Sequence, residues 1–162
     1  MHYNVGDYVV YPLHGAGIIN GIVEKENDGE LVSYYCLVFP YGNLQLMIPV
    51  DRAEEVGLRP IVSPEDIDRL LAYLRTSDVM PKEANWNKRQ RENLERMKSG
   101  DIYSVADVYK FLAKREADKS LSSGEKKMLI SARKVLFSEI QLVKGTSPEA
   151  IEAAVANAIN GK

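Results

Sequence analysis

The sequence has one cysteine, one tryptophan and two histidines among its 162 residues. A single cysteine, Cys36, excludes an intramolecular disulfide, and so few histidines leave no ligand set for a structural zinc site. No apolar run approaches the roughly 18 residues that a membrane span needs. The first residues, "MHYNVGDYVV", lack the basic, apolar and small-residue order of a signal peptide. These absences predict a cytoplasmic protein with no membrane partner, no metal and no other cofactor.

Catalytic constellations are also missing from the sequence. His2 stands at the terminus and His14 in a glycine-rich turn, with no HExxH spacing around either. The segment "HGAG" is not followed by a helix with Lys-Ser/Thr, so it does not match a phosphate-binding loop. The neighbouring carboxylates Glu54 and Glu55 are most simply solvated. We therefore predict no catalytic residues and a protein that is not an enzyme.

The net charge of −2 conceals an uneven distribution along the chain. Residues 1–62 carry 3 Lys and Arg against 8 Asp and Glu, whereas residues 63–162 carry 18 against 15. Within residues 82–134 the count is 14 against 8. The local field of the second half, and not the whole-chain charge, therefore decides whether a nucleic acid is a plausible partner, and that field is basic.

The first sixty residues have the pattern of short strands. Runs rich in β-branched and aromatic residues, such as "DYVVYP" and "ELVSYYCLVF", are separated by glycine-containing turns that include Asp28-Gly29. Gly15 and Gly17 lie where a strand of a small barrel must bend sharply. Strands of this length and spacing predict a small antiparallel β-barrel of Tudor or SH3 type.

From Ser63 the apolar residues recur with helical periodicity. The pattern predicts about five helices in a compact bundle, most of them preceded by a residue that favours the N-cap position. The expected N-caps are Ser63, Asn85, Ser104, Ser122 and Ser147. The fold class is thus α+β, all-β and then all-α, with a β domain over residues 1–60 and a helical domain over residues 63–162.

The only tryptophan stands in "NWNKRQREN", residues 85–93, where the sequence leaves two interpretations open. On a helix, Trp86 shares one side with Gln90, Leu94 and Met97, which favours a buried indole. Its place in the first turn, close to cationic residues, favours an indole that projects and stacks on or inserts between bases. The cationic residues in question are Lys88, Arg89 and Arg91.

A second basic site opens the longest predicted helix. Lys126 and Lys127 lie in its first turn, where the helix dipole disfavours cations. Solvated lysines and a phosphate-binding helix start explain this placement about equally well.

At these residues the sequence resembles the CarD family of bacterial transcription regulators. The similarity includes "GDYVVYPLHGAGII", "IPV", "NWNKRQRENLERMKSGD" and "LSSGEKKMLISARKVLFSEI", and it covers nearly the whole chain. The first domain also resembles the polymerase-interacting module of transcription-repair coupling factor, whose helicase motifs are absent here.

The resemblance implies a Tudor-like domain that binds the β subunit of RNA polymerase and a helical domain that contacts promoter DNA. Trp86 would be a wedge in the minor groove at the upstream edge of the bubble. Lys88, Arg89, Arg91, Lys126 and Lys127 would contact the DNA backbone. The polymerase-binding residues would be Leu46, Met47 and Ile48, although some relatives carry an arginine where Met47 stands.

The predicted function is therefore a transcription regulator that stabilises the open promoter complex without reading the base sequence. The protein would be monomeric when free and associated with the nucleoid through RNA polymerase. An alternative is a protein–protein adaptor that does not bind DNA and whose Trp86 belongs to the core. A third possibility, an RNA-binding SH3-like module, fits poorly with the acidic first half.

Overall fold

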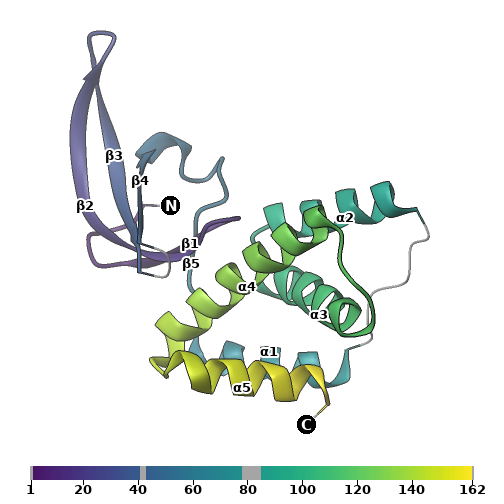
Figure 1. The fold of residues 1–162 in the computed structure, drawn as a ribbon. Coiled ribbons are helices and arrows are strands. Elements are labelled where there is room, and N and C mark those ends of the chain that lie inside the picture. The colour runs from purple at the N-terminus through teal and green to yellow at the C-terminus, as the bar shows by residue number, and fades with distance from the viewer. Residues whose placement is uncertain (1, 41–42, 78–84, 162) are drawn as a thin grey trace.

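A computed structural model describes residues 2–40, 43–77 and 85–161 of the chain. The strands are β1 (Tyr8–Tyr11), β2 (Gly15–Asn27), β3 (Glu30–Phe39), β4 (Leu44–Pro49) and β5 (Arg59–Pro60), with a short 3₁₀ helix at Val50–Arg52. The helices are α1 (Pro64–Thr76), α2 (Trp86–Lys98), α3 (Ile102–Asp118), α4 (Ser123–Lys144) and α5 (Pro148–Ile159). All strands precede all α-helices, as the sequence predicts (Figure 1).

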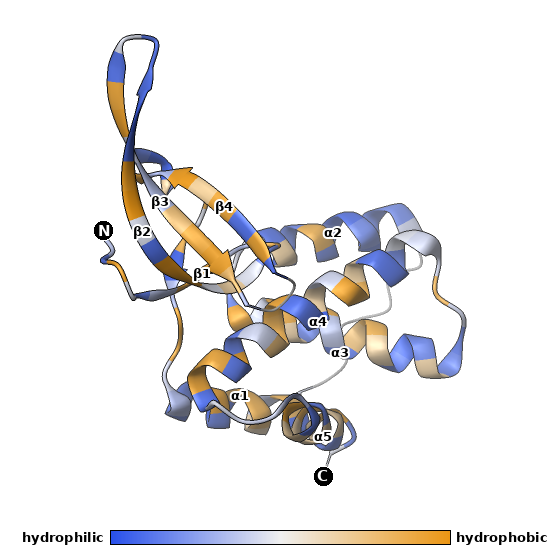
Figure 2. Cartoon of the chain, turned by 60° about the vertical axis from the view of Figure 1, so that its left-hand side comes forward, coloured by the Kyte–Doolittle hydropathy of each residue, from blue (hydrophilic) through white to orange (hydrophobic). Residues whose placement is uncertain are grey.

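The five strands form one antiparallel sheet in the order β4-β3-β2-β1-β5. The turn between β2 and β3 uses Asp28 and Gly29, both at positive φ, which suits the right-handed twist of a tight hairpin. This hairpin extends away from the helices, and its distal end is hydrophilic (Figures 1 and 2). The strands β4 and β5 are the two edges of the sheet, so within the described residues one side of the β4 backbone has no partner strand.

The two halves have separate hydrophobic cores. The core of the sheet includes Val9, Ile19, Tyr35, Phe39 and Ile48. The core of the helical half gathers apolar residues from all the helices, because each one turns an apolar stripe inward. Alternating hydrophobicity therefore explains the first half, and 3.6-residue periodicity explains the second.

The helix starts follow the capping chemistry of the sequence, with one exception. Ser63 and Ser122 make complete capping boxes with Asp66 and Glu125, and Asn85 and Ser147 also cap their helices. The expectation that Ser104 caps α3 was wrong. Asp101 is the N-cap, and its carboxylate accepts a hydrogen bond from the Ser104 backbone N–H at 3.2 Å. Because Asp caps as well as Ser does, the helix begins three residues earlier than expected.

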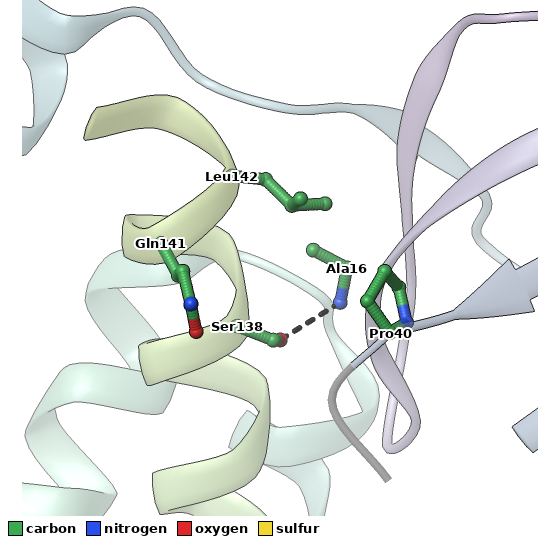
Figure 3. A pocket seen from close by; sticks show the side chains of 5 residues that line it. All are labelled: Ala16, Pro40, Ser138, Gln141 and Leu142. Atoms are coloured by element: carbon green, nitrogen blue, oxygen red, sulfur yellow. Dashed lines mark hydrogen bonds between the residues drawn. The ribbon is translucent and has the colours of Figure 1, made fainter. Parts of the chain in front are cut away.

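The start of β2 lies directly on α4, where it joins the two halves. Gly15 has φ +103°, and a Cβ there would lie 2.7 Å from Ser138 Oγ. The backbone N–H of Ala16 donates a hydrogen bond to the same hydroxyl at 2.9 Å (Figure 3). Glycine is therefore needed at position 15 both for its backbone conformation and for the close approach of the helix. Pro40, Gln141 and Leu142 line the shallow pocket beside this contact.

A buried ion pair also holds the two halves together. Glu139 of α4 has no exposed surface, and both its carboxylate oxygens accept hydrogen bonds from the Arg59 guanidinium, at 2.7 and 2.8 Å. The Val62 N–H donates to Glu139 at 3.0 Å, and Arg59 Nε donates to the carbonyl of Gly100 at 2.6 Å. The pair thus connects β5, the following linker, the α2–α3 turn and α4.

We predict that Arg59→Ala lowers the free energy of unfolding by about 3–5 kcal/mol, because it leaves the Glu139 carboxylate buried without its cationic partner and with the Val62 N–H as its remaining donor. Chemical denaturation of the two proteins measures this difference. Arg52→Ala, which removes an exposed arginine of the same half, is the matched control and should change stability by less than about 0.5 kcal/mol. Equal stabilities for Arg59→Ala and wild type would contradict the prediction.

His14, which directly precedes Gly15 at the contact between the two halves, makes the stability of the fold depend on pH. Burial lowers the pKa of His14 from its ordinary value of 6.5, and the nearby charge of Lys134 lowers the pKa further. The folded protein therefore favours the neutral imidazole, so the unfolded chain binds a proton at higher pH. The resulting stabilisation is complete above the unfolded pKa and is lost as the pH falls below it.

We expect the free energy of unfolding of wild type to fall between about pH 7.5 and about pH 5.5 more than that of His14→Gln. Urea denaturation at both pH values measures the two slopes. His2→Gln serves as the control, because His2 is exposed at the start of the chain. A wild-type slope no steeper than that of His14→Gln would exclude this role for the imidazole.

Candidate nucleic-acid interface

The Trp86 indole is not part of the core. Trp86 is the first residue of α2, directly after the N-cap Asn85, and 42% of its surface is exposed. A Cβ at Gly124 would lie 3.8 Å from Trp86 Cζ2 and 3.2 Å from Gln90 Nε2. The indole therefore rests by one edge on the start of α4, and part of its surface faces solvent.

The positions of the buried residues in α2 explain why Trp86 lies beyond the packed part of the helix. Its two buried residues are Asn93 and Met97, which lie within about 20° of the Trp86 direction on the helix. The indole thus faces the same way as the buried side of α2, but about two to three turns nearer the N-terminus. Leu94, which we expected on the packed face, is 38% exposed. It lies two turns after Trp86 and adds apolar surface to that side of α2.

The basic residues of α2 divide into two kinds. Lys88 and Arg91 are exposed and lie about 140–160° from the Trp86 direction, on the outer face of the helix. The ammonium of Lys88 lies 4.0 Å from the carboxylate of Glu92. Arg89, in contrast, points inward, and only 12% of its side chain is exposed. The three cations predicted to surround the indole therefore do not form one continuous patch.

The guanidinium of Arg89 contacts the buried carboxylate of Glu125. Its Nη2 lies 3.5 Å from Glu125 Oε2, and Arg115 Nε of α3 lies 3.1 Å from the same oxygen. Glu125 is also the acidic residue of the α4 capping box, and its Oε1 accepts a hydrogen bond from the Ser122 N–H at 3.2 Å. One carboxylate thus contacts groups from α2, α3 and α4.

The two lysines at the start of α4 are both exposed, but they point in different directions. Lys127 lies one turn after Gly124 and about 60° from it, on the side of α4 that carries the indole. Lys126 lies about 160° from Gly124, on the far side. Of the two, Lys127 therefore belongs to the surface that contains Trp86.

The predicted polymerase-binding strand lies in the sheet, on the side of the molecule away from the start of α2 (Figure 1). Leu46, Met47 and Ile48 belong to the edge strand β4, which pairs with β3 alone among the residues that the structure describes. Met47 is 39% exposed and Leu46 is partly buried, whereas the Ile48 side chain lies in the core of the sheet. Ile48 can therefore offer a partner only its backbone.

Sequence reasoning did not assign Gly124, Arg115 or Glu125 to this site, and it placed Leu94 on the packed face. A signal for Gly124 does exist, because glycine is a poor helix former in the first turn of a long helix and suggests a close approach there. In the part of the chain that the structure describes, no three His, Cys, Asp or Glu side chains form a metal-binding group. No helix within the same residues is long and apolar enough to cross a membrane.

The fold and these surfaces define a class of two-part proteins. A sheet with an exposed edge strand is joined to a helical bundle, and the bundle presents an indole on the same surface as a lysine. Comparison with known families agrees with this description. Residues 3–62 match the CarD-like/TRCF RID domain, and residues 69–156 match the CarD C-terminal domain. The chain is also 32% identical over 154 residues to a protein of Bacillus subtilis (strain 168) named "Putative transcription factor YdeB". That alignment covers 93% of this chain and 98% of the relative.

The chain therefore belongs to the CarD family, a family of transcription factors, which gives it a role related to transcription. The RID domain points more generally to an interaction with RNA polymerase.

Proposed function

We propose that this protein binds the β subunit of RNA polymerase through β4 and stabilises the open promoter complex, with Trp86 as a wedge at the upstream edge of the bubble. The observation that carries the proposal is the exposure of Trp86 at the start of α2, where it rests on Gly124, and Lys127 follows Gly124 by one turn of α4. An apolar side chain that unstacks a base step needs support from behind and phosphate-binding cations nearby. Trp86, Gly124 and Lys127 meet this requirement.

The same exposure argues against the adaptor hypothesis in the form that places Trp86 in the core. Trp86 is 42% exposed as a whole residue, and leaving part of its large apolar ring in water has a cost that a place in the core does not explain.

The two halves have complementary tasks in this proposal. Residues 1–62 are acidic, which suits a protein partner better than a nucleic acid, whereas the helical half is basic. Docking of β4 on the polymerase raises the effective concentration of the helical half at the promoter, so weak DNA contacts become sufficient.

Stabilisation of the open complex then follows from differential affinity. A wedge that fits only an unwound base step binds the open state better than the closed state. It shifts that equilibrium by no more than the difference between the two binding free energies.

Trp86→Ala should shorten the lifetime of the open complex on the order of tenfold, because base–aromatic contacts contribute about 1–3 kcal/mol each. Promoter-opening kinetics, measured by competitor challenge, give this lifetime, and binding to the polymerase should be unchanged. Ile130→Ala, which removes an exposed apolar residue of α4, is the matched control. Equal open-complex lifetimes for Trp86→Ala and wild type would refute the wedge.

Met47→Glu should weaken binding to a β-subunit fragment about tenfold, which corresponds to 1.4 kcal/mol. The introduced carboxylate must lose water when the edge strand is covered, whereas it is solvated in the free protein. Leu31→Glu, at an exposed position on the distal part of the β2–β3 hairpin, is the control and should bind as wild type does. If Met47→Glu retains full affinity, β4 is not the docking strand.

A further inference from the structure

Glu125 occupies an unusual position for a carboxylate. It is 1% exposed, and it lies in the first turn of α4 directly after Gly124, on which the indole rests. Its neighbours are the Ser122 N–H and the guanidinium groups of Arg89 and Arg115. A buried carboxylate is tolerated only where such partners compensate for its lost hydration.

The two arginines contact Glu125 differently. Arg89 Nη2 donates a hydrogen bond to Oε2 at 3.5 Å. Arg115 Nε lies 3.1 Å from the same oxygen, but it is buried and has no hydrogen-bond partner among the described residues. Arg89 is therefore needed to complete the hydrogen bonding of this site. If Arg89 turned outward to a phosphate, the carboxylate would no longer have the partner that donates to it from α2.

The contact with Glu125 also fixes the first turn of α2. Arg89 follows Trp86 by three residues, so the two side chains belong to the same turn of the helix. Gly124 and Glu125 are consecutive residues of α4, and they contact Trp86 and Arg89 respectively. A shift of this turn relative to α4 would therefore change both contacts at once and alter the angle at which the indole projects.

We propose that Arg89 and Glu125 form a positioning pair, which seats the first turn of α2 on α4 and so presents Trp86, and that Arg89 does not contact phosphate. The part of this proposal that concerns DNA rests on the proposed function above. In contrast to the resemblance-based expectation, the phosphate contacts then fall to exposed cations, with Lys127 on the side of α4 that carries the indole and Arg91 on the outer face of α2.

Two measurements on the full-length chain separate positioning from phosphate binding. Trp86 is the only tryptophan, so its emission wavelength and its quenching by acrylamide report the seating of the indole in the free protein. The salt dependence of binding to a forked DNA duplex counts the phosphates that the protein neutralises, because the slope of log K against log salt changes by about 0.9 for each of them.

Arg89→Ala should shift the Trp86 emission to longer wavelength, increase the quenching constant and leave the salt slope unchanged. Glu125→Gln should give the same emission shift while retaining its capping hydrogen bond, because glutamine also completes a capping box. Lys127→Ala is the matched control, with unchanged emission and a slope reduced by about 0.9. Arg89→Lys keeps a charge that reaches Glu125, and it should restore the wild-type emission.

The proposal is overturned if Arg89→Ala lowers the salt slope as Lys127→Ala does, or if Arg89→Ala or Glu125→Gln leaves the emission unchanged. Far-UV circular dichroism confirms folding, and if Arg89→Ala unfolds, the comparison of Arg89→Lys with Arg89→Gln decides instead. If Trp86→Ala leaves the open-complex lifetime unchanged, the wedge function fails. The tryptophan emission of the free protein would still test whether Arg89 and Glu125 position Trp86.

Discussion

The ion pair between Arg59 and Glu139 is the contact on which the arrangement of the two halves depends. It joins residues 80 positions apart, and it involves a carboxylate with no exposed surface, held by both ends of a guanidinium fork. Such a pair is more useful for fixing geometry than for adding net stability, because desolvation offsets much of the attraction. Bidentate contact restricts both the distance and the angle between β5 and α4. The edge strand β4 and the tip of α2 are thereby held at a defined separation.

A fixed separation matters for a protein that has to contact two sites at once. If the sheet and the bundle moved freely, binding at one surface would do little to place the other. The hydrogen bond from Arg59 to the Gly100 carbonyl extends this constraint to the turn that ends α2. The Glu125 contacts then fix the beginning of the same helix. Two buried carboxylates of α4, fourteen residues apart in the sequence, thus hold α2 near its two ends.

Local chemistry explains which parts of this structure the sequence could predict. The caps at Ser63 and Ser122 and the turn at Asp28-Gly29 depend on neighbouring residues, so their patterns are visible in the sequence. Where two neighbouring residues could both cap a helix, as Asp101 and Ser104 could, the pattern alone did not choose correctly.

The inward turn of Arg89 could not be predicted, because it depends on Glu125, which is 36 residues away and has its own local explanation as a capping residue. The exposure of Trp86 was likewise undecided, since its helical direction indicates burial while its place in the first turn determines how far the bundle covers it. The sequence therefore predicted the elements and the surfaces they carry, but not the long-range ion pairs that orient them.

The contact between Gly15 and Ser138 has a consequence for how this protein can diverge. Position 15 tolerates only glycine as long as α4 lies where it does, and α4 can approach only as long as that position has no side chain. The start of β2 and the middle of α4 must therefore vary together. A chimera that takes its sheet from one relative and its bundle from another should assemble only when the residues on both sides of this seam come from the same parent.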